Sequence, residues 1–187
     1  MQMQPVEAHE NTEALIVGGG PAGLAAAIAL GQRGIACTVV EARTLPIDKA
    51  CGEGLMPDSR ETLAQLGISL TESDGQPFRG IRFQNSTHRV DGHFPHGTGL
   101  GVRRPHLHAL LAARAAATGA RLLSNSHIQL PSDTGPAADG TRTALVNGQP
   151  MRFRNQGRER TGRRRHRRDS LPGAGFAGLL ELGRPHL

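Results

Sequence analysis

The residues with the clearest chemical consequence are a run of glycines that begins at position 18. Gly18-Gly19-Gly20-Pro21-Ala22-Gly23 fits the pattern G-x-G-x-x-G. In that pattern the first glycine permits a tight turn, the second lets the backbone approach a diphosphate, and the third lets a helix pack closely on a strand. The free N–H groups at the start of such a helix attract phosphate oxygens. The run therefore predicts a diphosphate-binding turn.

An acidic residue follows the turn at a distance that suits the same chemistry. Glu41 lies about twenty residues further on, the separation at which a strand-end carboxylate accepts hydrogen bonds from ribose hydroxyls. A carboxylate there also repels a 2′-phosphate, which disfavours NADP at this site. The alternative is a purely structural turn with Glu41 as a surface acid. The neighbouring elements favour the dinucleotide.

Those neighbouring elements form one βαβ unit. Residues 14–17 are a short apolar run that stops at the glycines, as a buried parallel strand does. Residues 22–30 are small and apolar, and the glycines at 31 and 34 can end a helix there. Residues 35–40 form a second apolar run that leads to Glu41. Strand, turn, helix and strand thus position the candidate site.

The rest of the chain predicts further helices and a small antiparallel part. Residues 58–66 predict a helix capped by Asp58 or Ser59, and residues 103–118 predict an amphipathic helix. Asn147-Gly148 between two apolar runs indicates a hairpin. We expect an α/β fold: a Rossmann-like dinucleotide-binding domain with a βαβ start and a small antiparallel β insertion. Short strands are expected at 80–83, 88–90, 121–123, 127–130, 144–146 and 151–153.

Charge is concentrated in one short segment. Residues 152–168 hold nine arginines and one acid, whereas residues 1–151 hold 12 basic and 13 acidic residues. A uniformly basic nucleic-acid-binding domain is therefore not expected, and no specific nucleic-acid partner is predicted. No apolar run reaches the roughly 18 residues of a membrane span, and the first residues do not resemble a signal peptide.

Cysteine and histidine usage predicts neither disulfides nor a metal centre. The chain has two cysteines, Cys37 and Cys51, which is too few for a disulfide framework. A reducing cytoplasm is therefore the expected location. His106 and His108 are two apart on a predicted helix and face different directions. Their spacing, with His93 and His96, suits no usual metal site.

Three stretches together resemble a known family. The first, 15–27, reads Leu-Ile-Val-Gly-Gly-Gly-Pro-Ala-Gly-Leu-Ala-Ala-Ala. It resembles the start of FAD-dependent oxidoreductases of the para-hydroxybenzoate hydroxylase and geranylgeranyl reductase superfamily. Glu41-Ala42-Arg43 matches that family's strand-end acid. Residues 48–57 resemble the K-x-C-G-x-G-L loop of the reductase-like branch, and 104–111 resembles its R-x-x-L-x-x-x-L helix start.

The resemblance implies that the Rossmann-like domain is an incomplete FAD/NAD(P)-binding domain, and it implies a cofactor and residues that hold it. FAD is the implied cofactor, with NAD(P)H as the reductant and a small molecule as the substrate of the full-length enzymes. The loop of Cys51 and Gly52 lies near the flavin ring in the family, and Arg104 faces the phosphates. The resemblance implies these cofactor-binding residues: Gly18, Gly19, Gly20, Pro21, Ala22, Gly23, Glu41, Ala42, Arg43, Cys51, Gly52, Arg104 and Ile128.

Three functions stay open at this point. The first is the N-terminal part of an FAD-dependent oxidoreductase, either a monooxygenase or a geranylgeranyl reductase-like enzyme. The second is an NAD-binding Rossmann protein without flavin, which Glu41 permits. The third is a truncated, non-catalytic dinucleotide-binding fragment. No catalytic residue is assigned, and the residues indicate no oligomeric state.

The chain divides by composition into a polar leader at 1–12, a partial FAD-binding domain at 13–153 and an arginine-rich tail at 154–187. We expect the tail to be disordered and solvated. Binding of nucleic acid or an acidic surface is the alternative, although the tail lacks interleaved aromatic residues. The family's later G-A-D-G segment, its closing G-D motif and its substrate domain are all missing.

A shift of reading frame would explain the missing G-A-D-G segment. The codons CGG GAG CGG ACG GGN encode Arg158-Glu159-Arg160-Thr161-Gly162. The same bases read two positions later give GGA GCG GAC GGG, which encodes Gly-Ala-Asp-Gly. We therefore predict that the coding DNA beyond codon 154 carries an open oxidoreductase frame. Sequencing that DNA checks the hypothesis, and the absence of such a frame would remove it.

Overall fold

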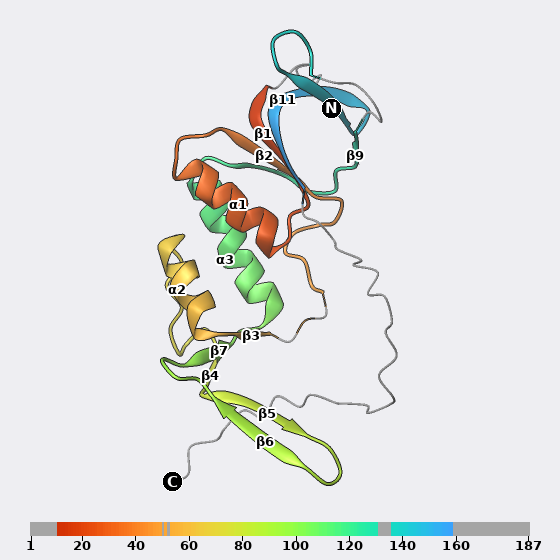
Figure 1. Cartoon of the computed structure of the whole chain (residues 1–187). Helices are drawn as coiled ribbons and strands as arrows, with labels where there is room; N and C mark the ends of the chain where they lie inside the picture. Colours follow the sequence, from red (N-terminus) through yellow and green to blue (C-terminus); the bar gives the residue numbers. More distant parts are fainter. Residues whose placement is uncertain (1–10, 50, 52, 131–135, 159–187) are drawn as a thin grey trace, which may run out of the picture. The chain divides into compact units, whose positions relative to one another are not determined.

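The structure is a computed structural model that describes residues 11–49, 51, 53–130 and 136–158 (Figure 1). The chain divides into two compact units. The described part of the first unit comprises residues 11–49, 104–130 and 136–158, and that of the second comprises 51 and 53–103. The architecture is α/β with a largely parallel sheet and small antiparallel sheets, which confirms the predicted fold class.

The first unit is built on a six-stranded sheet with the order β8-β2-β1-β11-β10-β9. β8, β2, β1 and β11 are parallel, and β10 and β9 extend the sheet through antiparallel pairs. The chain moves outward from β1 to β2 and β8, and β11 lies on the other side of β1. The order therefore reverses beside β1. The strands are β1 (Thr12–Val17), β2 (Cys37–Val40), β8 (Arg121–Leu123), β9 (Ile128–Gln129), β10 (Arg142–Val146) and β11 (Gln149–Arg158).

Two helices of this unit pack side by side: α1 (Pro21–Gly31) and α3 (Arg104–Ala117) (Figure 1). Both match the predicted helices to within one residue at each end. Close approach depends on Gly31, because a Cβ there would overlap the carbonyl oxygen and side chain of Thr118. After α1 the chain turns at Gly34, whose φ of 71° suits glycine. The small side chains of α1 thus bring α3 close to it.

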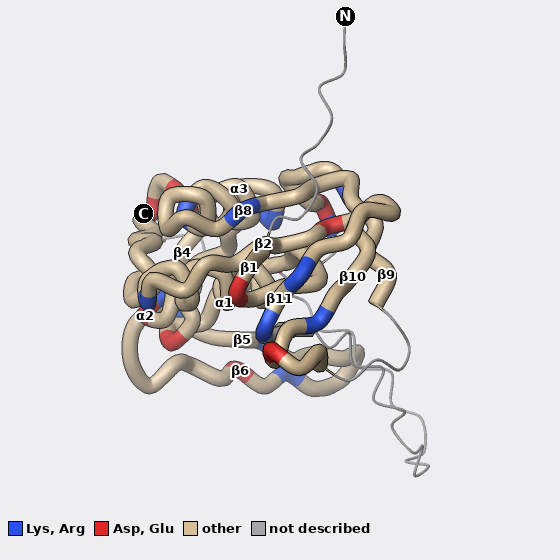
Figure 2. The backbone as a smooth tube through the Cα atoms, turned by 90° about the horizontal axis from the view of Figure 1, so that it is seen from above, with Lys and Arg blue, Asp and Glu red and all other residues tan. Residues whose placement is uncertain are grey.

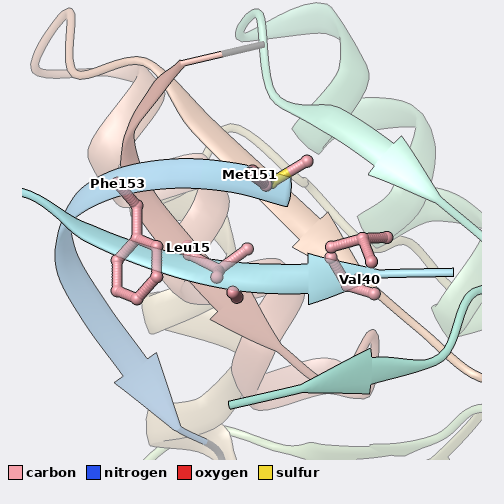
Figure 3. Packing of buried hydrophobic residues seen from close by; sticks show 6 residues of the cluster. Leu15, Val40, Met151 and Phe153 are labelled. Carbon is pink, nitrogen blue, oxygen red and sulfur yellow. The ribbon is translucent and has the colours of Figure 1, made fainter. Parts of the chain in front are cut away.

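The core of the sheet joins residues far apart in the sequence. Leu15, Val40, Met151 and Phe153 are buried in one hydrophobic cluster, which Ala144 and Val146 complete (Figure 3). β10 and β11 contribute through a hairpin whose turn residues Asn147 and Gly148 have φ values of 50° and 81°. Positive φ at both positions is the geometry of a type I′ turn, so the predicted hairpin is confirmed.

The arginine-rich segment begins inside this sheet. Met151 and Phe153 are buried, whereas Arg152 and Arg154 are exposed, which is the alternation of a strand with one covered face. Figure 2 shows basic residues along β11, and Arg152 Nη2 lies 2.6 Å from Asp139 Oδ2. β11 runs to Arg158, beyond the boundary at 153 that composition indicates, and β1 begins at Thr12 inside the expected leader. Residues 1–10 and 159–187, the rest of the leader and tail, lie outside the described residues.

The described residues of the second unit form one helix and two small antiparallel sheets. One sheet has the strand order β3-β7-β4, and the other is the hairpin β5-β6. Phe78 and Phe94 meet edge to face with ring centroids 5.5 Å apart, and Gly99 leaves room for the Phe78 ring. The bounds are β3 (Gly54–Leu55), α2 (Pro57–Gln65), β4 (Gln76–Phe78), β5 (Gly80–Gln84), β6 (Arg89–His93) and β7 (Gly99–Gly101).

The predicted cap of α2 is wrong. Neither Asp58 nor Ser59 caps this helix, because its N-cap is Met56 and no side chain makes the capping bond. Pro57 occupies the first helical position, where its fixed φ suits the helix and its missing N–H is not needed. Asp58 then falls in the first turn, where its charge complements the helix dipole.

The described residues contain neither a membrane-spanning helix nor a cluster of metal ligands. No helix among them combines the length and apolar composition of a membrane span. They also contain no cluster of three or more His, Cys, Asp or Glu side chains arranged to hold a metal ion.

The buried cluster predicts a large difference between two phenylalanines. Phe153 is 2% exposed and Phe83 is 51% exposed. Phe153→Ala should therefore lower the free energy of unfolding by about 3–5 kcal/mol, because it opens a cavity. Phe83→Ala should change it by less than about 1 kcal/mol. Urea unfolding of both variants measures this, and equal losses would contradict the packing described here.

Candidate dinucleotide site

The glycine turn lies at the carboxyl end of β1, where the sheet order reverses. Gly18 leaves the strand with a φ of 106°, which only glycine adopts readily, and its N–H donates to the carbonyl of Val40 at 2.9 Å. Gly20 is the N-cap of α1 and Pro21 occupies its first turn. Strand, turn and helix follow in the predicted order, and α1 starts directly from the turn.

Close packing limits side chains at two of the glycines. A Cβ on Gly23 would overlap the carbonyl oxygen of Gly18, so this position holds α1 against the turn. A Cβ on Gly19 would lie 3.0 Å from the Cβ of Glu41, which is tighter than side chains normally pack. Gly23 thus has the role that the G-x-G-x-x-G pattern gives its third glycine, and Gly18, through its positive φ, has the role of the first.

Glu41 is held against the turn by main-chain donors. The N–H of Gly19 donates to Oε2 of Glu41 at 2.8 Å, and the N–H of Arg43 donates to Oε1 at 2.8 Å. The main chain of Glu41 is fixed by Leu123 O and Ser126 N, at 2.8 and 2.9 Å. A carboxylate oxygen can accept more than one hydrogen bond. Each oxygen of the half-buried Glu41 side chain therefore retains capacity for a further donor.

His108 is the site residue that the sequence analysis did not assign. Its side chain is fully buried on α3, and Nε2 lies 2.7 Å from the carbonyl oxygen of Gly19. The sequence carried a signal, because residues 104, 107, 108, 111 and 115 follow the spacing of a buried helical stripe. Arg104 is half-buried and lies one helical turn before His108, on the same side of α3.

The other predicted cofactor contacts lie in different parts of the chain. Ala42 and Arg43 are exposed, and Arg43 joins the cluster only through its N–H. Ile128 packs against the hydrophobic core of the sheet from β9. Cys51 is an exposed thiol of the second unit, and Gly52 lies outside the described residues. Cofactor contacts by these residues stay predictions.

The buried cysteine has no chemical role at this site. Cys37 is in β2, and its thiol lies 3.7 Å from the carbonyl oxygen of Ala27. Burial raises the pKa of the Cys37 thiol above its ordinary value, which keeps the unreactive thiol form. Cys37 is thus a packing residue between β2 and α1.

The fold and the site together define a class of protein. A parallel sheet whose order reverses beside β1 binds its ligand at the carboxyl ends of the strands, and the glycine turn lies there. The carboxylate at the end of β2 meets that turn. The first unit is thus a Rossmann-like dinucleotide-binding domain. The family model described as FAD binding domain matches residues 11–154, so the chain belongs to this family.

Known proteins agree with this assignment. A menaquinone reductase from Mycobacterium tuberculosis is 34% identical over 118 residues, which is 61% of this chain and 29% of that protein. A flavoprotein/dehydrogenase from Cytophaga hutchinsonii has the same fold, with a TM-score of 0.67 and 23% identity over 80% of this chain and 39% of its own. A geranylgeranyl bacteriochlorophyll reductase-like protein from Thermoplasma acidophilum has a TM-score of 0.61 and 23% identity. The match covers 81% of this chain and 39% of that protein. The chain spans less than a third of the curated relative.

The packing of the turn predicts that Gly23 tolerates no side chain. Gly23→Ala should destabilise the domain by more than about 1 kcal/mol, since the new methyl group would overlap Gly18. Gly92→Ala is the control, because a Cβ there lies 3.7 Å from the nearest heavy atom, Ile81 O. Thermal unfolding checks both variants, and a neutral Gly23→Ala would show that the turn is looser than described.

Proposed function

We propose that the turn at residues 18–23 and Glu41 hold the ADP half of FAD, and that the chain is the N-terminal FAD-binding part of an FAD-dependent oxidoreductase. The observation that carries this proposal is the 2.8 Å hydrogen bond from Gly19 N–H to Glu41 Oε2. It joins the diphosphate turn to the carboxylate that would accept the ribose hydroxyls.

The residues fit the ADP half of FAD. Gly18 and Gly23 keep side chains out of the turn, and the start of α1 supplies N–H groups and a partial positive charge. The remaining lone pairs of Glu41 suit two ribose hydroxyls. Arg104, at the start of α3, would add a cation for the diphosphate. Bound FAD would supply the redox chemistry, while these residues bind and orient it.

Reduction is the reaction that we favour for a longer protein containing this domain. The curated relative is a menaquinone reductase, and residues 48–57 resemble the loop of the reductase-like branch. We propose a quinone-type small molecule as the substrate and NAD(P)H as the source of electrons. Both cysteines are free thiols, which suits a reducing cytoplasm.

Oxidation of NADPH with FAD supplied tests for turnover. A substrate-dependent rate well above that of free flavin would support the oxidoreductase function.

The proposed site predicts a specific loss when Glu41 is changed. Glu41→Ala should weaken FAD binding about 10- to 100-fold, since a hydrogen bond to a charged group contributes about 1.5–3 kcal/mol. Glu13→Ala is the matched control. Its carboxylate also accepts from a main-chain N–H, that of Ala36 at 2.9 Å, but it lies toward the amino end of β1. Titration followed by flavin fluorescence measures both affinities.

Two results would contradict the proposal. An equal loss in Glu13→Ala would show that Glu41 acts through stability alone. Tighter binding of NAD than of FAD by the unaltered chain would favour a Rossmann protein without flavin, which Glu41 also permits.

A further inference from the structure

The hydrogen bond of His108 has an unusual setting. The side chain is fully buried, and Nε2 lies 2.7 Å from the carbonyl oxygen of Gly19. A carbonyl oxygen only accepts, so Nε2 carries the hydrogen. Nδ1 is also buried and has no hydrogen-bond partner among the residues that the structure describes. Only one of the two ring nitrogens is therefore satisfied.

Packing alone does not explain a histidine at this position. Its neighbours on the buried stripe of α3 are Leu107, Leu111 and Ala115. A buried polar atom without a partner is unfavourable, and a leucine would avoid it. The bond to Gly19 is what distinguishes the histidine from an apolar residue. That bond spans 89 positions of the sequence and ends in the diphosphate turn.

We propose that His108 is a positioning residue for the diphosphate of the bound dinucleotide. The peptide between Gly19 and Gly20 is planar, and in the trans form its C=O and N–H point in opposite directions. By holding the carbonyl of Gly19 toward α3, His108 sets the direction of the Gly20 N–H. Glu41 holds the preceding N–H, that of Gly19, at 2.8 Å. The peptide groups on both sides of Gly19 are thus fixed.

Such fixing matters because the turn consists of glycines. Glycine has the widest backbone freedom, so a free glycine turn loses the most entropy when it binds a ligand. Ordering the donors before binding removes part of that loss. The effect of His108 reaches the ligand through the Gly20 N–H and hence concerns the diphosphate. The effect of Glu41 concerns the ribose as well.

The different effects of His108 and Glu41 can be tested with two ligands, adenosine and ADP. The inference rests on the proposed FAD site, and the experiment uses the full chain with calorimetric titration. His108→Leu should lower the affinity for ADP about tenfold, which is the equivalent of one lost hydrogen bond. It should leave the affinity for adenosine unchanged. Glu41→Ala should lower the affinity for both ligands. His108→Gln keeps an N–H donor at similar reach and should restore most of the ADP affinity.

A control separates positioning from stability. Leu111→Ala removes buried packing from the same helix at a position three residues after His108. It should lower the unfolding temperature while the ratio of ADP to adenosine affinity stays that of the unaltered chain. If His108→Leu does not fold, the ratio measured for His108→Gln and His108→Asn decides, since asparagine is too short to reach Gly19. A lower ratio for asparagine than for glutamine supports the inference.

The outcomes distinguish this inference from the proposed function. If the unaltered chain binds neither ligand, both are overturned. If Glu41→Ala weakens both ligands but His108→Leu leaves the ratio unchanged, the FAD site stands and the role of His108 is overturned. A ratio that falls equally in Leu111→Ala and His108→Leu also overturns it.

Discussion

The site depends on one hydrogen bond, from the N–H of Gly19 to the carboxylate of Glu41. The parallel register of β1 and β2 makes it possible, because Val17 is paired with Val40 and the two strands end together. The next residues of each strand therefore meet at the same edge of the sheet. A shift in this register would separate the carboxylate from the turn, and the proposed ribose and diphosphate contacts would no longer belong to one site.

Small residues allow the helices to complete this arrangement. Gly23 lets α1 start against the turn, and Gly31 lets α3 pack against α1. α3 then places His108 at the carbonyl of Gly19. The turn is thus contacted by a carboxylate from the end of β2 and by an imidazole from a helix that follows much later in the chain.

Local patterns predicted the elements near the site because each depends on neighbouring residues. The glycine turn, α1 and β2 follow from spacing, and the β10-β11 hairpin follows from Asn147-Gly148. The prediction for the N-cap of α2 was wrong because Pro57 occupies the first helical position. The sequence patterns did not predict the sheet β3-β7-β4, because strands of two or three residues show no periodicity.

The sequence by itself determined the βαβ unit, the carboxylate that meets its turn and the resemblance to FAD-dependent enzymes. These features are encoded in short stretches whose physical requirements are local. Only the tertiary structure decided that His108 binds Gly19, that Ile128 packs in the core and that β11 lies beside β1. Those relations join residues far apart in the chain. They arise when buried apolar surfaces pack together, which no local spacing specifies.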